Sequence, residues 1–309
     1  MRVGYNPKKG RIKTDSGVTI DRAFIAHMVL TAAQALAAST TGVLAATNLD
    51  DEEQLFTVGI NSPAVPRALS ITGNVSGITG DVVITGTNFA GEEIEETIAL
   101  NGTATVNGNK AFETVDMIEL PVEVHAPVQQ VETATVAGTV TEAGDAAVTV
   151  TSALFDEAVV VAVPVEVDDD AAAIALAIRT ALTADSDIAE HFVVSGATDK
   201  VILTAKLPAS NDATLNIAIA TGTATGVETA ATSENTTAGV PYDIVSVGWN
   251  DKIGLPYLLA HNTVLKAYLN NVLEGTAPTV TVSPTAIESN TVDLHSALNG
   301  SAVDIYLIV

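Results

Sequence analysis

The 309-residue sequence contains no cysteine, few aromatic residues and few basic ones. Without cysteine, a disulfide, a thiolate metal site and a cysteine nucleophile are all excluded. Aromatic residues make up 4% of the chain and charged residues 16%, whereas enzyme pockets usually gather aromatic, histidine and charged side chains in one place. The composition therefore favours a structural protein over an enzyme, and we expect no catalytic residue, no cofactor and no metal.

The residues that are abundant favour β structure. Apolar residues make up 47% of the chain, mainly as Ala, Val, Ile and Leu, and they are accompanied by many Thr and Gly. Such a mixture suits short strands joined by tight turns. The length predicts two domains, or one domain with an insertion.

Long apolar runs are also missing. The stretch 23–38 is interrupted by His27, Thr31 and Gln34, and it is too short and too polar to cross a bilayer. We therefore expect no signal peptide and no membrane partner, and a protein that is made in a cytoplasm.

The net charge is −24, yet the basic residues are concentrated at the start of the chain. Six of the 13 fall within the first 22 positions beside two acidic residues, so this segment carries +4 and the remainder −28. An acidic body repels nucleic acid, so we expect no nucleic-acid partner. The basic segment could dock on an acidic surface or could be a solvated, disordered terminus. Its basic residues are Arg2, Lys8, Lys9, Arg11, Lys13 and Arg22.

The first part of the chain is predicted to form an arm followed by β structure. Residues 1–44 indicate an extended arm and then a short helix or turn, which Thr31 could cap. Asn101-Gly102 and Asn107-Gly108 are hairpin signals, and the placement of Ile94, Thr97 and Leu100 indicates a bulge or a two-sided strand. Together they predict an antiparallel meander or sandwich, with strands at 68–74, 81–88, 93–100 and 110–120.

A different pattern begins near residue 131. Asp168, Asp169 and Asp170 precede the stretch 171–184, whose apolar residues recur with helical spacing, and carboxylates complement the start of a helix. Strands flank this helix in the order ββαβββ, at 147–152, 158–167, 191–196, 200–206 and 213–221. The linkers of this unit are predicted at ETATVAG (132–138) and ATSENTTAGV (231–240).

After residue 239 the first pattern returns, with strands predicted at 242–249, 263–271, 279–284 and 303–309 and a loop at Asn250-Asp251. The C-terminal strand is apolar, so we expect it to be paired inside a sheet. The predicted fold class is therefore mainly β. It combines an antiparallel β-sandwich or barrel-like host domain (45–130 plus 240–309), an inserted small α+β domain (131–239) and the arm.

Few residues form a pattern that would carry chemistry. The five histidines lie in five separate segments, without metal-site spacing. The three consecutive aspartates could seed a Ca²⁺ site, but they lack the alternation of an EF-hand loop, and helix capping explains them better. Gly73, Gly77, Gly80, Gly222 and Gly226 fit hairpins and not a phosphate cradle.

Two further groups of residues have competing interpretations. The carboxylates Glu92, Glu93, Glu95 and Glu96 are best explained as a solvated strand edge that blocks unwanted sheet pairing. Trp249, the only tryptophan, could be a sugar-binding platform, but a core or interface anchor is favoured. With Tyr257 it forms our candidate interface anchor.

Three parts of the sequence resemble structural proteins of tailed bacteriophages. The stretch 66–121 runs through ITGN, DVVITGTN, GEEIEETIALNG and KAFETV, an order of strands and hairpins typical of such proteins. Residues 171–240 resemble an accessory module of phage virion proteins, and GWNDKIGLPY and VDIYLIV near the end also resemble phage structural sequence. The resemblance covers most of 29–309 and implies no catalytic residues.

The resemblance implies a virion protein made in the host bacterial cytoplasm. The favoured hypothesis is a capsid decoration protein on the outer head surface, with the major capsid protein and copies of itself, as a trimer or hexamer, as partners. Its six basic residues in 1–22 would form the capsid-docking arm. One alternative is a tail-tube protein that forms stacked rings. Another is a module that binds a host surface glycan through 131–239 and Trp249.

Overall fold

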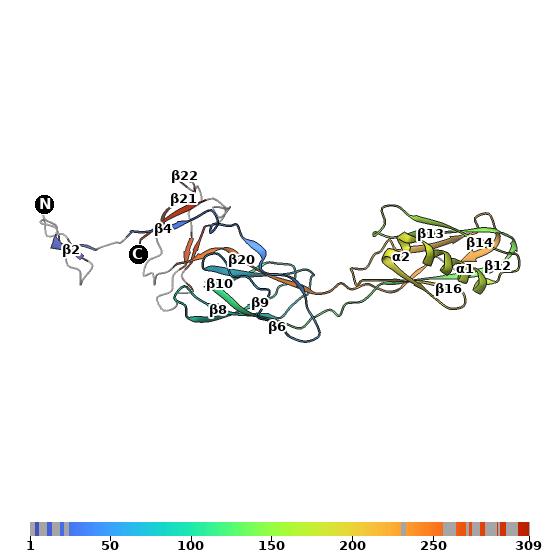
Figure 1. The fold of residues 1–309 in the computed structure, drawn as a ribbon, viewed down its shortest axis with the longest axis horizontal. Coiled ribbons are helices and arrows are strands. Elements are labelled where there is room, and N and C mark those ends of the chain that lie inside the picture. The colour runs from blue at the N-terminus through green and yellow to red at the C-terminus, as the bar shows by residue number, and fades with distance from the viewer. Residues whose placement is uncertain are drawn as a thin grey trace. The chain divides into compact units, whose positions relative to one another are not determined.

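The structure is a computed structural model that describes residues 4–5, 11–13, 19–21, 25–229, 233–255, 264–269, 272–273, 279–281, 289, 291–294 and 302–308. The chain divides into two units (Figure 1). Unit 1 comprises Met1–Val124 and Asp243–Val309, and unit 2 comprises His125–Tyr242. The expected insertion at 131–239 falls inside unit 2, whose bounds are a few residues wider.

Unit 1 contains two antiparallel sheets that share a core. The strands of the first sheet are β5 (Ser39–Asn48), β7 (Arg67–Gly73), β10 (Val106–Phe112), β20 (Ile244–Gly254), β23 (Thr279–Thr281) and β24 (Thr291–Asp293). They follow the order β10-β7-β20-β24-β23, and β5 also pairs with β20. The strands of the second sheet are β6 (Gln54–Phe56), β8 (Asp81–Thr87), β9 (Glu93–Ala99) and β11 (Thr114–Leu120). They follow the order β6-β11-β8-β9.

Apolar residues alternate along the strands of unit 1, so that one face of each strand is apolar and packs in the core. Val82 and Ile84 on β8 are fully buried, as are Leu69 on β7 and Val247 on β20, and all four belong to one cluster. Burying a side chain of this size contributes about 1.5–3 kcal/mol. The mainly β, sandwich-like architecture expected from the alternation is thus confirmed.

Two smaller sheets complete the described part of unit 1. The first consists of β1 (Gly4–Tyr5), β2 (Arg11–Lys13) and β3 (Thr19–Asp21) in that order. The second consists of β4 (Ile25–Leu30), β21 (Val264–Leu269), β22 (Val272–Leu273) and β25 (Val303–Ile308). Its order is β22-β21-β25-β4, so the apolar C-terminal strand is paired on both sides, as the sequence predicted.

The chain leaves and re-enters unit 1 at one place. Val124 N donates a hydrogen bond of 2.8 Å to Asp243 Oδ2, and Leu49 N donates one of 2.8 Å to Asp243 O. Asp243 is completely buried. Because both ends are fixed side by side, the sandwich is continuous across the point where unit 2 is inserted.

Unit 2 is a two-sheet structure with helices. Its elements are β12 (Val131–Glu142), β13 (Gly144–Thr151), β14 (Val159–Val165), α1 (Ala171–Ala184), α2 (Ser186–His191), β15 (Phe192–Ser195), β16 (Lys200–Ala205), β17 (Asn216–Ala220), β18 (Thr225–Thr229) and β19 (Glu234–Thr237). One sheet has the order β15-β16-β12-β18, with β19 also paired to β12, and the other has the order β14-β13-β17.

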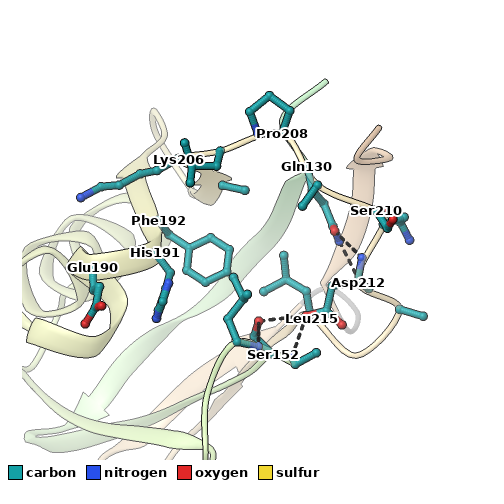
Figure 2. Close-up of a pocket in the computed structure, with 17 residues that line it drawn as sticks. Gln130, Ser152, Glu190, His191, Phe192, Lys206, Pro208, Ser210, Asp212 and Leu215 are labelled. Atoms are coloured by element: carbon teal, nitrogen blue, oxygen red, sulfur yellow. Dashed lines mark hydrogen bonds between the residues drawn. The ribbon is translucent and has the colours of Figure 1, made fainter. Parts of the chain in front are cut away.

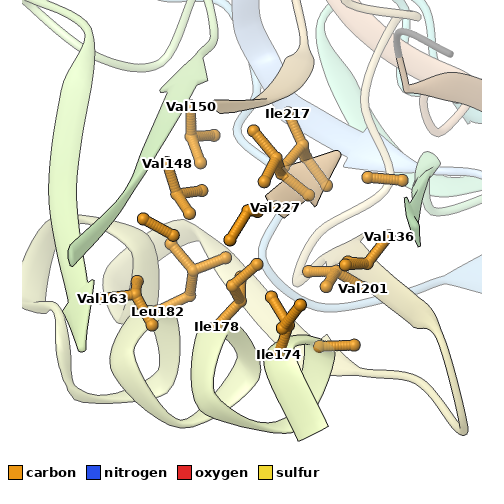
Figure 3. Close-up of a cluster of buried hydrophobic side chains, with 14 of the residues drawn as sticks. Val136, Val148, Val150, Val163, Ile174, Ile178, Leu182, Val201, Ile217 and Val227 are labelled. Atoms are coloured by element: carbon orange, nitrogen blue, oxygen red, sulfur yellow. The ribbon is translucent and has the colours of Figure 1, made fainter. Parts of the chain in front are cut away.

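Helix α1 packs on both sheets of unit 2 through one apolar stripe. Ile174, Ile178 and Leu182 are fully buried and lie in one cluster with Val148 of β13 and Val201 of β16 (Figure 3). The side chain of Asp170 accepts hydrogen bonds from the N–H groups of residues 172 and 173 at the start of the helix. The capping interpretation of the aspartate run is thus confirmed for its last member.

The element order of unit 2 is richer than the predicted ββαβββ. ETATVAG (132–138) was expected to be a linker, but it lies in β12, and part of the expected linker 231–240 forms β19. Strand β18 and helix α2 were also missed. Thr, Gly and Glu weaken the apolar alternation of these segments, so the prediction of linkers was wrong. Pairing with neighbouring strands supplies what local propensity lacks.

Two predicted hairpin or loop positions in unit 1 lie inside strands. Asn107-Gly108 falls within β10, where the pairing with β7 shifts register between Asn107 and Ala111. Asn250-Asp251 falls within β20, where the register shifts between Trp249 and Ile253. These turn-forming residues mark irregularities of the β-bulge type, where the strand carries two more residues than its partner without reversing its direction.

The single strand predicted at 110–120 is two strands. β10 and β11 are separated by Glu113 and belong to different sheets, so the chain crosses from one sheet of the sandwich to the other at that residue. The sequence left a bulge or a two-sided strand open for 93–100, and β9 pairs with β8 without a register shift, so this pairing contains no bulge. Its core face is formed by Ile94, Ile98 and the partly buried Glu96.

The expected arm at 1–44 also differs from the structure. β1, β2 and β3 pair with one another, and β4 pairs with β25, whereas the prediction was an extended segment. β5 begins at Ser39 and belongs to the sandwich. Between β4 and β5, the N–H groups of Gln34 and Ala35 both donate to Thr31 O at 2.9 Å. Of the two predicted alternatives, a short helix or a turn, the structure therefore has a turn.

We predict that unit 1 folds without unit 2. Replacing residues 125–242 by a short Gly-Ser linker should leave one cooperative calorimetric transition, because the core clusters of the two units share no residue and Val124 is bonded directly to Asp243. The full chain should show two calorimetric transitions, one for each unit. The midpoint temperature of the shortened chain should match one of them within a few degrees. An insoluble product, or loss of cooperativity, would show that unit 1 depends on unit 2.

Candidate binding pocket and polar clusters

Unit 2 contains a cavity between two loops. It has a volume of about 660 Å³ and lies between the segment that joins β13 to β14 and the one that joins β16 to β17 (Figure 2). Its apolar lining includes Leu154, Phe192, Leu207, Pro208 and Leu215. The volume and the mainly apolar lining match those of ligand-binding pockets in general.

One aspartate joins the two loops of the cavity. Asp212 Oδ2 accepts hydrogen bonds of 2.8 Å from Ser152 Oγ and from Ala153 N, and its Oδ1 accepts from the N–H and hydroxyl of Thr214. Burial by itself would raise the pKa of Asp212, but these hydrogen bonds outweigh it and hold the pKa below its usual value. Asp212 therefore stays ionised and fixes the shape of the cavity.

Two leucines on the rim of the cavity are exposed to water. Leu207 is 75% exposed and Leu154 52%. Glu190 and His191, at the end of α2, line the same cavity, and the ring of Phe155 lies 5.9 Å from both the His191 and Phe192 rings. No sequence pattern indicates this site, because its two loops are more than fifty residues apart. The only local signal was a leucine in each polar loop.

A second polar cluster lies on β12 of the same unit. Glu132 is 2% exposed and its Oε1 lies 2.5 Å from Ser233 Oγ, which also lies 3.0 Å from Asn216 Oδ1. Ile217 N donates to the same hydroxyl. A hydroxyl has a single hydrogen to donate, and Ser233 Oγ lies within hydrogen-bond distance of two acceptors, Glu132 Oε1 and Asn216 Oδ1.

The pKa of Glu132 agrees with this arrangement. Burial raises it, the hydrogen bond from Ser233 opposes that, and the negative charges of Asp212 and Glu234 raise it further. Among the described residues, Glu132 Oε2 has no hydrogen-bond partner. Ionising this carboxyl group therefore costs free energy, and the hydrogen bonds of the cluster do not compensate for that cost.

In unit 1, a buried arginine crosses the first sheet. Arg67 is 2% exposed, and its Nε and Nη2 donate to Asn250 O while its Nη1 donates to Leu36 O at 2.7 Å. Its Nη2 lies 3.6 Å from Asp251 Oδ1. Desolvation lowers the pKa of Arg67 to about 10, although the charge of Asp251 opposes this, so the guanidinium is charged at neutral pH.

Trp249 completes this cluster. Its Nε1 donates a hydrogen bond of 3.0 Å to Ala37 O, and the guanidinium carbon of Arg67 lies 5.7 Å from its ring centroid. A Cβ at Gly42 would come within 2.5 Å of the ring. The structure thus places Trp249 against the core of unit 1, which agrees with the core alternative of the sequence interpretation and argues against a sugar platform.

The glutamate cluster of β9 has two roles. Glu92, Glu93 and Glu95 are exposed and β9 lies at the edge of its sheet, as the sequence predicted. Glu96 instead turns inward and accepts hydrogen bonds from the N–H groups of Asn109 and of residue 110 in the β10 bulge. Burial raises its pKa, and those two hydrogen bonds oppose the shift.

Most of the predicted docking and anchor residues cannot be placed. Arg2, Lys8, Lys9, Arg22 and Tyr257 lie outside the described residues. Arg11 and Lys13 lie in β2, of which the backbone is described. Within the described ranges, no group of three or more His, Asp or Glu side chains could hold a metal ion, and no helix is long and apolar enough to span a bilayer.

We predict that replacing Arg67 destabilises unit 1 alone. Arg67→Met removes the buried guanidinium that donates to the carbonyl groups of Asn250, which is buried, and of Leu36, so it should lower the free energy of unfolding by about 3–5 kcal/mol. Lys110→Met, which removes one exposed bond to Glu95 O, should cost about 1 kcal/mol or less. Calorimetry of the full chain separates the two units, and an unchanged unit 1 transition in Arg67→Met would contradict the prediction.

We also predict that Glu132→Gln increases the stability of unit 2 by an amount that depends on pH. Because the folded-state pKa of Glu132 is raised, its stabilising contribution is complete below the unfolded value and is lost as the pH rises through the folded value. The glutamine cannot ionise, so the variant should gain stability over the natural chain as the pH rises from 4 to 8, by on the order of 1 kcal/mol. Thermal unfolding at a series of pH values measures this, and a constant difference would refute it. Glu157→Gln, at an exposed site between β13 and β14 whose charge does not act on Glu132, is the control.

Comparison of the chain with protein-family models, with curated proteins and with solved structures finds no match.

Proposed function

We propose that this chain is a structural protein of a tailed-bacteriophage virion, namely a decoration protein bound to the outside of the capsid. Its partners are then the major capsid protein and further copies of itself. The resemblance of 66–121 and 171–240 to phage structural sequence is the starting point of the proposal, and the organisation of the chain supports it.

The observation that carries the proposal is the insertion of one independently packed unit into another. Unit 1 is a β-sandwich-like body, and unit 2 has its own hydrophobic core and joins unit 1 at Val124 and Asp243. A decoration protein needs one part that holds the particle and one that faces outward. Two cores that share no residue allow these parts to serve separately.

Charge supports the same division of roles. The basic residues of 1–22 carry +4, and the remaining chain carries −28. In solution the acidic body keeps copies apart, and the basic segment gives them one attractive contact with an acidic lattice. This contact is electrostatic, so it weakens as salt is added.

We predict that neutralising this segment prevents binding to the particle. Lys8→Gln, Lys9→Gln and Arg11→Gln together should reduce co-sedimentation with capsids that lack the protein by at least tenfold. The matched control combines Ala162→Glu, Leu176→Glu and Ala218→Glu at exposed sites of unit 2, which changes the net charge by the same amount and should bind normally.

The outcomes separate the alternatives. If the variant with Lys8→Gln, Lys9→Gln and Arg11→Gln binds capsids as well as the natural chain does, the basic segment does not dock the protein. Stacked rings or tubes of purified protein in electron micrographs, with no capsid binding, would favour the tail-tube alternative.

A further inference from the structure

We infer that the cavity of unit 2 is a docking socket for a large apolar side chain carried by a basic polypeptide segment of another protein. The capsid-decoration proposal gives the cavity no role, so this inference goes beyond it. Four observations lead to it: the lining of the cavity, the state of its polar groups, the exposure of its rim and the charge of unit 2.

The lining of the cavity is mainly apolar and suits an apolar group. The side chain of Gln130 makes two hydrogen bonds with the backbone of Asp212. Gln130 Nε2 donates to Asp212 O at 2.9 Å, and Asp212 N donates to Gln130 Oε1 at 2.7 Å. Ser152 Oγ donates to Asp212 and accepts from the N–H of residue 154. These three polar side chains are committed to one another. They therefore hold the wall of the cavity together and do not present free polar groups to a ligand.

The rim favours a polypeptide over a small molecule. Leu207 and Leu154 are 75% and 52% exposed, beside a cavity whose inner wall includes Phe192 and Leu215. A small ligand inside the cavity would leave these two leucines in water. A polypeptide would fill the cavity with one side chain and cover the rim with its flanks, which is the usual arrangement of an anchor residue and its surroundings at a protein interface.

The cavity is also fixed in shape before anything binds. Asp212 joins its two loops, and the Lys206 amino group donates to Ala189 O, away from the cavity in Figure 2. A preformed pocket loses little conformational freedom on binding. It can therefore hold a single anchor side chain with measurable affinity.

Charge decides what surrounds the anchor. Residues 125–242 contain 16 acidic side chains and three basic ones, a net charge of −13. Exposed Glu190 lines the cavity itself. The field of the whole unit attracts a cationic segment and repels an acidic one, so the anchor is flanked by Lys or Arg.

Three synthetic peptides test the inference on the full chain with labelled Leu and Val methyl groups. The first has Phe at its centre with two Lys on each side, the second replaces Phe by Gly, and the third replaces each Lys by Glu. We expect saturable shifts of the Leu154, Leu207 and Leu215 methyl signals with the first peptide. The dissociation constant should rise at least tenfold with either of the other two.

Variants separate the socket from a general attraction between charges. Leu154→Asp with Leu207→Asp should abolish the shift at Leu215, and Ala213→Trp should block the cavity while both rim leucines remain. Leu176→Asp, which introduces a charge at a 59% exposed leucine of α1, should bind as the natural chain does.

Three results would overturn the inference: equal affinity for the Phe and Gly peptides, normal binding by the Leu154 and Leu207 double variant, or shifts at these leucines with neutral oligosaccharides and none with peptides. The experiment contains no capsids. A negative result with the peptides would therefore not contradict the decoration proposal, and a protein that does not bind capsids could still bind the peptides through this cavity.

Discussion

The hydrogen bond from Val124 to Asp243 is the contact on which the organisation of this protein depends. It holds together the two points where the chain leaves and re-enters unit 1, and the same aspartate fixes Leu49 through its carbonyl group. Because the ends meet, unit 1 closes its sandwich as if nothing were inserted. Unit 2 is then free to build its own core, its own polar clusters and its own cavity.

The two units use polar side chains for different purposes. In unit 1, Arg67 binds carbonyl oxygens of β20 and of the turn after β4, and Trp249 lies beside it, so these groups hold irregular backbone to the sheet. In unit 2, Asp212 fixes two loops around an open cavity. Buried polar groups are stable only when they are paired: Arg67 is paired with a bulge in β20 and with the turn after β4, and the partly buried Asp212 is paired with the loop after β13.

The turn-forming residues show where local patterns mislead. Asn107-Gly108 and Asn250-Asp251 are typical of chain reversals, yet both lie in bulges of long strands. At the first bulge, Glu96 accepts hydrogen bonds from the freed N–H groups of β10, and a Cβ at Gly108 would come within 2.5 Å of that carboxylate. The glycine leaves room for this carboxylate and does not form a hairpin, and no local window of sequence can distinguish the two.

The sequence by itself determined the features that depend on residues close together in the chain: the β class, the strands of 67–99, helix α1 with its Asp170 cap, the charge of the first 22 residues and the change of pattern near residue 131. Only the tertiary structure decided the features that need distant segments to meet. These are the crossing between sheets at Glu113, the pairing of 234–237 with β12, the inward turn of Glu96 and the cavity between 152–154 and 206–215. Alternation and capping are local, and a sequence pattern records them directly. Strand pairing and cavity shape arise from contacts between segments that are distant in the chain, such as Ser152 and Asp212, which are 60 residues apart, and single-sequence periodicity contains no trace of them.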